Sequence, residues 1–462
     1  MTNADGGALP AAYPAFDPLK IELRPTASLK AAKRNARTHS ARQLAQVQAS
    51  ISKFGFLAPI IVSADGHIVA GHARWTAAKA LKLEEVPVIP VEHLTADELR
   101  AYALADNKIA ANSGWDEDIL RIEIAELAVL SPELEPEILG FTTTEIDLLL
   151  DPVRKPDKTE TLPVLDRRVT LGVERGDLWL LGDHRLLCGD SREPASFARL
   201  MGDERARMVF SDPPYNVRIE GHVGGLGAIH HAEFAMASGE MSRTEFTTFL
   251  TQVFRNAADV SMDGAIHYQC MDWRHMSEML EAGQAVYSDL KNLCVWSKDN
   301  GGMGSFYRSQ HELVFVWKVG TAPHLNTVEL GRNGRYRTNI WEYPAASKTG
   351  QSSDLSMHPT VKPVPMVVDA IKDTSKRGEI VLDAFGGSGS TLIAAEKAKR
   401  RAQLIEYEPK YCETTIRRWQ KLAGREAVLD ATGETFAEAH ARRGAAMEDL
   451  ADRALGLTGE VA

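Results

Sequence analysis

Residues 378–408 contain the feature that most restricts the fold of this chain, a strand–turn–helix–strand pattern with a glycine-rich turn. An apolar strand at 380–382 leads into Gly386-Gly387-Ser388-Gly389, a helix-forming run begins near Thr391, and a second strand ends at Glu406. Such a βαβ unit belongs to a parallel sheet covered by helices. Glycines at its first turn let the backbone approach a ligand closely, and an acid ending the second strand suits ribose hydroxyls. No Lys-Ser or Lys-Thr pair follows the glycines, which argues against a phosphate-binding NTPase loop.

A second stretch, from Val209 to Asn216, ends another apolar strand abruptly. Asp212-Pro213-Pro214 stops the strand because neither proline can donate to a ladder and each restricts the residue before it. The turn gathers a carboxylate, the Pro213 carbonyl and the Tyr215 phenol at a strand's carboxyl edge, where open α/β sheets bind ligands. Two acceptors beside an aromatic ring suit a planar substrate with an exocyclic amine. The alternative is a strand-terminating turn in which Asp212 only caps a helix.

Four segments together resemble the amino-methylating DNA methyltransferases that use S-adenosyl-L-methionine. They are Leu187–Ser191, Asp212–Tyr215, His358–Pro363 and Phe385–Ser390, in the order typical of that family's circularly permuted beta group. The resemblance covers about residues 170–420. It implies an α/β fold, a circularly permuted Rossmann-like domain that binds S-adenosyl-L-methionine and acts on double-stranded DNA. Serine at position 390, where threonine is commoner, is a departure that we expect to be tolerated.

The resemblance also assigns roles to individual residues and favours adenine as the substrate base. It places catalysis at Asp212, Pro213, Pro214 and Tyr215. It places cofactor binding at Asp190, Lys362, Asp383, Phe385, Gly386, Gly387, Ser388, Gly389 and Glu406. Adenine is favoured because the related cytosine 4-amino methyltransferases more often begin the tetrapeptide with serine, and protein or RNA amide methyltransferases with asparagine. A third alternative is a DNA-binding adaptor of the partition type with a silent methylase domain.

The amino-terminal block, residues 18–112, resembles the small α+β ParB/sulfiredoxin-like domain of chromosome-partition proteins. The matching residues are Phe54-Gly55-Phe56 with Pro59-Ile60, and Gly71, Arg74 and Trp75 with Ala77-Ala78. In partition proteins the second turn contacts the triphosphate of CTP. Here Ala58 replaces the usual glutamine and His72-Ala73 lacks a basic residue. The favoured expectation is therefore a scaffold that positions the enzyme or joins it into a homodimer, and binding of CTP is the alternative.

The remaining segments complete the domain plan. We expect an acidic helical extension at 113–150, a linker at 151–168, the methyltransferase domain at 169–425 and a helical tail at 426–462. Within the methyltransferase domain, residues 320–357 lose periodicity and are expected to recognise the DNA target. Arginine, lysine and asparagine can contact phosphates or read base edges. The candidate DNA-binding residues are Arg332, Asn333, Arg335, Arg337 and Lys348.

The charge and the cysteine content restrict which partners the protein can bind and in which cellular compartment we expect it. The net charge of −10 argues against indiscriminate coating of DNA, but residues 18–53 carry eight Lys and Arg against one acid. The four cysteines form no Cys-x-x-Cys pair, and His222, His230 and His231 have a spacing that suits no zinc site, so we expect no metal. Without a signal or spanning segment, we expect a cytoplasmic, nucleoid-associated protein and no membrane partner.

Overall fold

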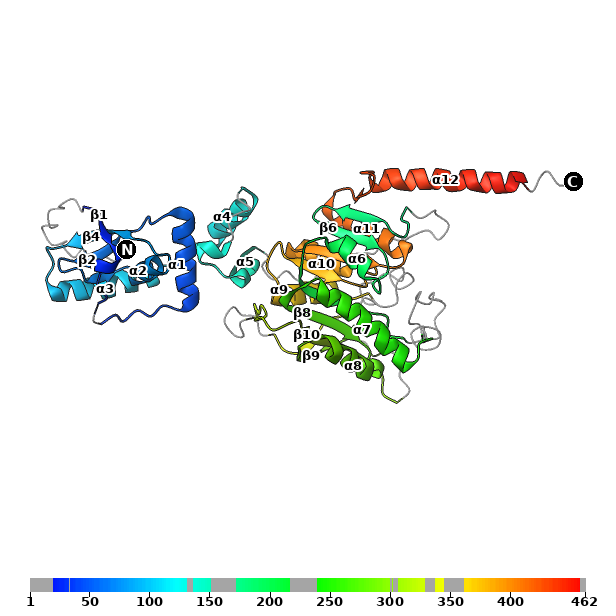
Figure 1. The fold of residues 1–462 in the computed structure, drawn as a ribbon, viewed down its shortest axis with the longest axis horizontal. Helices are drawn as coiled ribbons and strands as arrows, with labels where there is room; N and C mark the ends of the chain where they lie inside the picture. Colours follow the sequence, from blue (N-terminus) through cyan, green and yellow to red (C-terminus); the bar gives the residue numbers. More distant parts are fainter. Residues whose placement is uncertain are drawn as a thin grey trace, which may run out of the picture. The chain divides into compact units, whose positions relative to one another are not determined.

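The computed structural model describes residues 20–32, 34–130, 136–150, 172–216, 239–299, 301, 306–328, 337–344 and 361–457. The chain divides into two compact units, Met1–Pro152 and Val153–Ala462, which are described separately (Figure 1). The predicted linker at 151–168 and the three histidines at 222, 230 and 231 lie outside the described residues. The predicted domain boundaries stay predictions.

The first unit contains a four-stranded sheet with the order β1-β4-β2-β3. Its strands are β1 (Glu22–Pro25), β2 (Ile60–Ser63), β3 (Ile68–Ala70) and β4 (Glu85–Val91). Only β2 and β4 run parallel; β1 and β3 are antiparallel to their neighbours. Alternate side chains of β2 and β4, such as Ile60 and Val88, are fully buried and form the centre of this unit's core. This block therefore forms a small α+β unit, as the resemblance predicted.

Five α-helices accompany this sheet, and local capping explains where several begin. They are α1 (Ala41–Phe54), α2 (His72–Ala80), α3 (Ala96–Ala111), α4 (Glu117–Leu130) and α5 (Thr143–Leu150). Ser40 caps α1, and Thr95 with Glu98 forms a capping box on α3. Gln46 of α1 donates to the Gly140 carbonyl at 3.0 Å. The acidic extension thus contacts α1 within the same unit.

The second unit is built on a ten-stranded sheet with the order β11-β9-β10-β8-β7-β12-β13-β6-β5-β14. Its strands are β5 (Leu178–Leu181), β6 (His184–Cys188), β7 (Ala206–Ser211), β8 (Ser261–Met271), β9 (Asp289–Ser297), β10 (His311–Lys318), β11 (Ile340–Glu342), β12 (Ile380–Asp383), β13 (Arg401–Glu406) and β14 (Val428–Leu429). The five central strands β8, β7, β12, β13 and β6 are parallel. Strand β11 lies within the segment for which the sequence predicted no regular structure.

Helices cover both faces of this sheet, as expected for a parallel sheet whose strands are buried on both sides (Figure 1). The helices are α6 (Pro194–Met201), α7 (Arg243–Asp259), α8 (Met276–Val286), α9 (Val364–Thr374), α10 (Ser390–Ala398), α11 (Pro409–Ala423) and α12 (Phe436–Leu457). Side chains of α6, α7 and α8 pack in one core, and those of α9, α10 and α11 in the other. The predicted α/β, permuted Rossmann-like fold is confirmed, because the glycine-turn strand β12 follows β7 in the chain.

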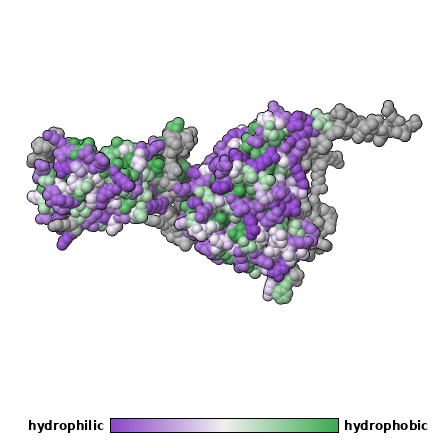
Figure 2. Space-filling view, in the orientation of Figure 1, coloured by the Kyte–Doolittle hydropathy of each residue, from purple (hydrophilic) through white to green (hydrophobic). Residues whose placement is uncertain are grey.

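The surface and the helices give no sign of a membrane span within the described residues. No helix there has the length and apolar composition to cross a bilayer. On the face that Figure 2 shows, hydrophilic residues cover most of both units and hydrophobic residues occur in small, scattered groups.

Candidate active site

The order of the strands reverses between β7 and β12. From β7 the chain passes through α7 to β8, whereas from β12 it passes through α10 to β13 on the other side. Doubly wound sheets bind ligands at such a reversal, outside the carboxyl ends of the strands. Asp212 follows β7, Asp383 ends β12, Glu406 ends β13 and Asp190 follows β6. The four predicted acids therefore lie along one edge of the sheet.

Asp212 belongs to a compact group of charged and hydroxyl side chains. The Lys362 ammonium lies 2.6 Å from Asp212 Oδ2, 2.9 Å from Glu312 Oε2 and 3.1 Å from the Tyr215 hydroxyl. The Tyr215 hydroxyl lies 2.7 Å from Asp212 Oδ1 and 2.9 Å from Glu312 Oε2. Lys298 pairs with the other oxygen of Glu312. These five residues, the Asp212 cluster, balance two carboxylates with two ammonium groups.

The sequence grouped Lys362 with the cofactor residues, but the structure places its ammonium in the Asp212 cluster. Its side chain is only 5% exposed and that of Glu312 9%, whereas Asp212 keeps 19% of its side chain exposed. A ligand can therefore reach Asp212 while Lys362 supports it from the protein side.

Burial and charge together set the protonation of this cluster. Burial raises the pKa of Asp212, although Lys362 acts in the opposite direction. Burial also acts to raise the pKa of Glu312, but Lys362 and Lys298 outweigh it and lower that pKa to about 2. Burial and Asp212 raise the pKa of Tyr215 well above its ordinary value. At neutral pH Tyr215 is thus a neutral hydrogen-bond donor and Glu312 is an anion.

Asp383 organises the turn that joins β12 to α10. Its Oδ1 accepts from the Ser211 hydroxyl at 3.2 Å and from the Phe385 backbone N–H at 3.0 Å, and its Oδ2 from the Thr391 hydroxyl at 2.6 Å. Ser211 Oγ also accepts from the Ala384 N–H at 3.1 Å. Asp383 therefore ties the ends of β7 and β12 together, and burial raises its pKa to about 6.

The glycine turn is held against β13 and α11. Gly389 has φ +82°, and a Cβ there would lie 2.7 Å from Thr415 Cγ2 of α11. A Cβ on Gly386 would lie 3.1 Å from Leu404 Cδ2, inside the protein. The sequence interpretation explained these glycines by the approach of a ligand. At Gly389 the positive φ and the contact with α11 also favour glycine, and at Gly386 the space for a side chain is tight because β13 packs against the turn.

Glu406 and Asp190 follow the next two strand ends. Glu406 accepts from the Gly387 N–H at 2.7 Å and the Glu408 N–H at 2.8 Å, and burial raises its pKa to about 7. Asp190 is paired with the Arg192 guanidinium at 3.0 Å. Carboxylate oxygens have about four acceptor positions, so both residues can accept further hydrogens. The donor set of a ribose or an adenine amine fits these two acids.

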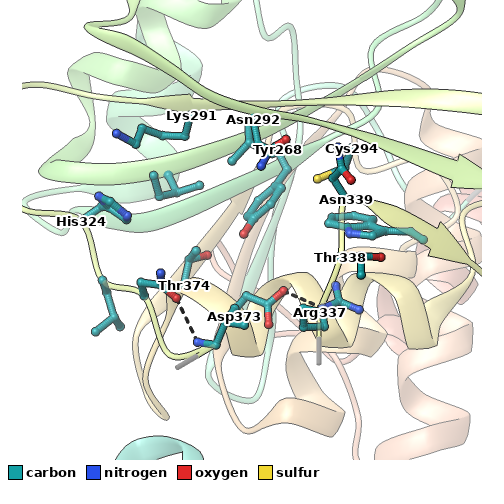
Figure 3. A pocket seen from close by; sticks show the side chains of 16 residues that line it. Tyr268, Lys291, Asn292, Cys294, His324, Arg337, Thr338, Asn339, Asp373 and Thr374 are labelled. Atoms are coloured by element: carbon teal, nitrogen blue, oxygen red, sulfur yellow. Dashed lines mark hydrogen bonds and ion pairs between the residues drawn. The ribbon is translucent and has the colours of Figure 1, made fainter. Parts of the chain in front are cut away.

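The predicted DNA-binding residues cannot all be located. Arg332, Asn333, Arg335 and Lys348 lie outside the described residues. Arg337 lies 3.1 Å from Asp373 and 3.3 Å from Asp369, and it donates to the Tyr343 hydroxyl at 2.8 Å. It lines a cavity of about 250 Å³ with Tyr268, His324 and Asn339 (Figure 3). Neither Asp212 nor Glu406 lines that cavity. In the structure, Arg337 thus joins α9 to the segment before β11.

Sequence reasoning missed Glu312, Ser211, Thr391 and Thr415. Glu312 had a visible signal, because an acid at the start of an apolar strand must find a partner when it is buried. The three hydroxyl residues gave no such signal in the sequence, since serine and threonine are common near strand ends and in helices.

The fold and the site together define a Rossmann-like methyltransferase domain, and the comparisons with known proteins agree. The DNA methylase family matches residues 206–417, and the ParB N-terminal domain matches residues 20–108. The ParB-like nuclease domain-containing protein YnaK of Escherichia coli K12 is 45% identical over 80 residues, which are 17% of this chain and 92% of that protein. The chain therefore combines a ParB N-terminal domain with a segment that matches the DNA methylase family.

Two further relatives match the methyltransferase unit. The type II methyltransferase M2.MboI of Moraxella bovis is 23% identical over 237 residues, which cover 48% of this chain and 82% of that protein. The crystal structure of the M1.HpyAVI–SAM complex is 18% identical, covers 50% of this chain and 97% of its own, and has a TM-score of 0.38.

Proposed function

We propose that this DNA methyltransferase transfers the methyl group of S-adenosyl-L-methionine to the 6-amino group of adenine. The observation that carries the proposal is the position of Asp212 and Tyr215, which directly follow β7, the strand next to β12 and its glycine turn. An acidic acceptor and an aromatic ring suit a flat base with an amine, and Asp as the first residue of the tetrapeptide favours adenine over cytosine.

The chemistry that we propose needs no covalent bond to the enzyme. The target base leaves the duplex, because its amine is otherwise paired and out of reach. Asp212 and the Pro213 carbonyl accept the two amine hydrogens, and Tyr215 stacks on the ring while Pro214 stiffens the turn. The amine nitrogen is thereby turned toward the methyl group that the bound cofactor would supply. As the nitrogen–carbon bond forms, the carbon–sulfur bond would break with its electron pair left on sulfur, and the proton that the amine loses would pass to Asp212 and from there to solvent. Rate enhancement comes from this alignment and from the negative charge of Asp212, which complements the cationic amine as it forms.

Cofactor binding is proposed for the edge formed by β12, β13 and β6. Glu406 accepts the ribose hydroxyls, and Asp190 accepts the amine of the cofactor's adenine. The turn from Phe385 to Gly389 closes the site from below, and Asp383 holds that turn in place through Ser211 and Thr391. What supports this assignment is the pair of acceptors, the partly buried Asp190 and the buried Glu406, beside a turn with little side-chain bulk.

For the amino-terminal unit we propose an accessory role in binding DNA or in forming a homodimer. The segment 18–53 supplies the positive charge. Burial lowers the pKa of Arg74, whose guanidinium folds back beneath Gly71. This packing and the missing second basic residue support a unit that does not bind CTP. A cytoplasmic location with the nucleoid, and DNA contacts by residues 320–357, complete the proposal.

The direct test is transfer of a tritiated methyl group from S-adenosyl-L-methionine to duplexes of random sequence. The labelled DNA is digested to nucleosides, and the nucleosides are separated to show which base carries the tritium. Label in adenine supports the proposal, whereas label in cytosine alone contradicts it.

A further inference from the structure

Glu312 is a buried acid to which the proposed mechanism gives no role. It is the second residue of β10, a strand that is apolar from Leu313 to Trp317. Three donors from different parts of the chain reach its carboxylate: the ammonium groups of Lys298 and Lys362 and the hydroxyl of Tyr215. A buried charge with three donors is well satisfied, so its position is closely defined.

The hydrogen count within the Asp212 cluster shows that two carboxylates share the same donors. The Tyr215 hydroxyl has one hydrogen, but oxygens of Asp212 and Glu312 lie 2.7 and 2.9 Å away. The Lys362 ammonium has three hydrogens and three acceptors, namely these two carboxylates and the Tyr215 oxygen. Tyr215 can therefore donate to only one carboxylate at a time, while Lys362 bonds both.

We propose that Glu312 is a positioning residue for methyl transfer. Its carboxylate accepts the hydrogen bond of the Tyr215 hydroxyl when the substrate amine is bonded to Asp212. The inference rests on the proposed function. Before the base arrives, Tyr215 donates to Asp212, which is the shorter contact. When an amine hydrogen takes that acceptor position, the hydroxyl turns to Glu312 with little movement of the ring. Tyr215 then keeps the orientation that stacking requires, and Lys362 stays in place beside Asp212.

A purely structural role is the alternative, in which Glu312 only neutralises two lysines. The two roles differ in what substitutions change. Glu312→Leu removes the acceptor, and Glu312→Gln keeps an acceptor oxygen but removes the charge. Either substitution leaves the Lys298 ammonium without the Glu312 carboxylate. Adding Lys298→Met removes that ammonium and restores much of the folding stability. If Glu312 positions Tyr215, this restoration does not return the catalytic rate.

The acid limb of the pH–rate profile measures whether the charge of Glu312 acts on Asp212, and the rate of the double variant with Lys298→Met separates a positioning role from a structural one. The groups that face Asp212 are Tyr215, Lys362, Glu312, Cys270 and Asp383. The negative charge of Glu312 raises the pKa of Asp212. Removing this charge by Glu312→Gln lowers that pKa, so the acid limb moves to lower pH while the plateau rate falls.

The experiment measures kcat, both KM values and the pH profile of the full-length chain. We expect kcat to fall about tenfold in Glu312→Gln and about 100-fold in Glu312→Leu, with both KM values within about twofold of wild type. Glu193→Gln, which replaces an exposed acid of the same unit, is the control and should match wild type. A wild-type kcat in folded Glu312→Leu, or an unmoved acid limb in Glu312→Gln, overturns the inference. If wild type itself transfers no methyl group to adenine, the proposed function fails instead.

Discussion

Among single residues, Asp212 gives the clearest test of the proposed chemistry. Replacing it by alanine removes the acceptor for the amine but leaves the glycine turn and Glu406 untouched. We expect the Asp212→Ala variant to lose about 100-fold or more in turnover, with cofactor affinity within about twofold of wild type. Tritium transfer and calorimetry with S-adenosyl-L-methionine measure the two quantities. Asp203→Ala, an exposed acid in the same unit, is the control. More than a tenth of wild-type turnover in Asp212→Ala would refute the assigned role.

Glu406 gives a prediction about pH and stability. Burial raises its pKa to about 7 from 4.5, so between these values the folded chain binds a proton that the unfolded chain lacks. Its contribution to stability is present below about pH 4.5 and is lost as the pH rises through about 7. Because glutamine does not titrate, the Glu406→Gln variant does not lose stability in this way as the pH rises. Relative to wild type, it should therefore gain up to about 3 kcal/mol in free energy of unfolding between about pH 5 and about pH 8.

Urea unfolding of both proteins at the two pH values measures this gain, and Glu193→Gln should show none. Cofactor affinity of Glu406→Gln should fall at the same time, because the variant has a weaker acceptor for the ribose. An equal stability difference at both pH values would contradict the raised pKa of Glu406.

At the level of single residues, the sequence predicted the acids that follow strands and missed those that depend on distant contacts. Asp212, Asp383 and Glu406 could be found because each directly ends or follows an apolar strand. The contact of Lys362 with Asp212 could not be predicted from the sequence, because the two residues are 150 positions apart. Glu312 was missed for the same reason, as its partners come from three other segments.

The glycine turn is the element whose geometry can be tested by a matched pair of substitutions. Gly389 and Gly378 have nearly equal φ, +82° and +78°, but only a Cβ at Gly389 meets another atom, Thr415 Cγ2 at 2.7 Å. Gly378→Ala should therefore cost only the left-handed backbone penalty of about 1 kcal/mol. Gly389→Ala should cost more and weaken cofactor binding several-fold. Thermal unfolding and calorimetry compare them, and equal losses would show that the contact with α11 is unimportant.

Elements with a strong local pattern could be predicted, and the sheet order could not. Strands β7, β12 and β13 formed where apolar runs predicted them. Strand β11 was not expected, because three residues without alternation give no periodic signal. The pairing of β7 with β12, about 170 residues later, follows from the family resemblance and not from any pattern in the sequence.

The whole molecule joins a methyltransferase unit to a smaller unit whose contribution can be measured separately. A chain that begins at Val153 should keep methyl transfer on short duplexes. It should bind DNA with a shallower salt dependence, by up to about 6 in log–log slope if each net positive charge of 18–53 meets a phosphate. Filter binding of both chains measures the slopes, and equal slopes would exclude DNA contacts by that segment. CTP should change neither slope; a response that Arg74→Ala abolishes would establish nucleotide binding.

The measurement that tests the central claim most directly is the identity of the methylated base in cellular DNA. The full-length chain is expressed in a host that lacks its own DNA methylation, and the DNA is digested to nucleosides and analysed by mass spectrometry. Asp212→Ala serves as the matched control. The account predicts N6-methyladenine with the wild-type chain and none with the variant. N4-methylcytosine without N6-methyladenine, or equal N6-methyladenine from wild type and variant, would contradict it.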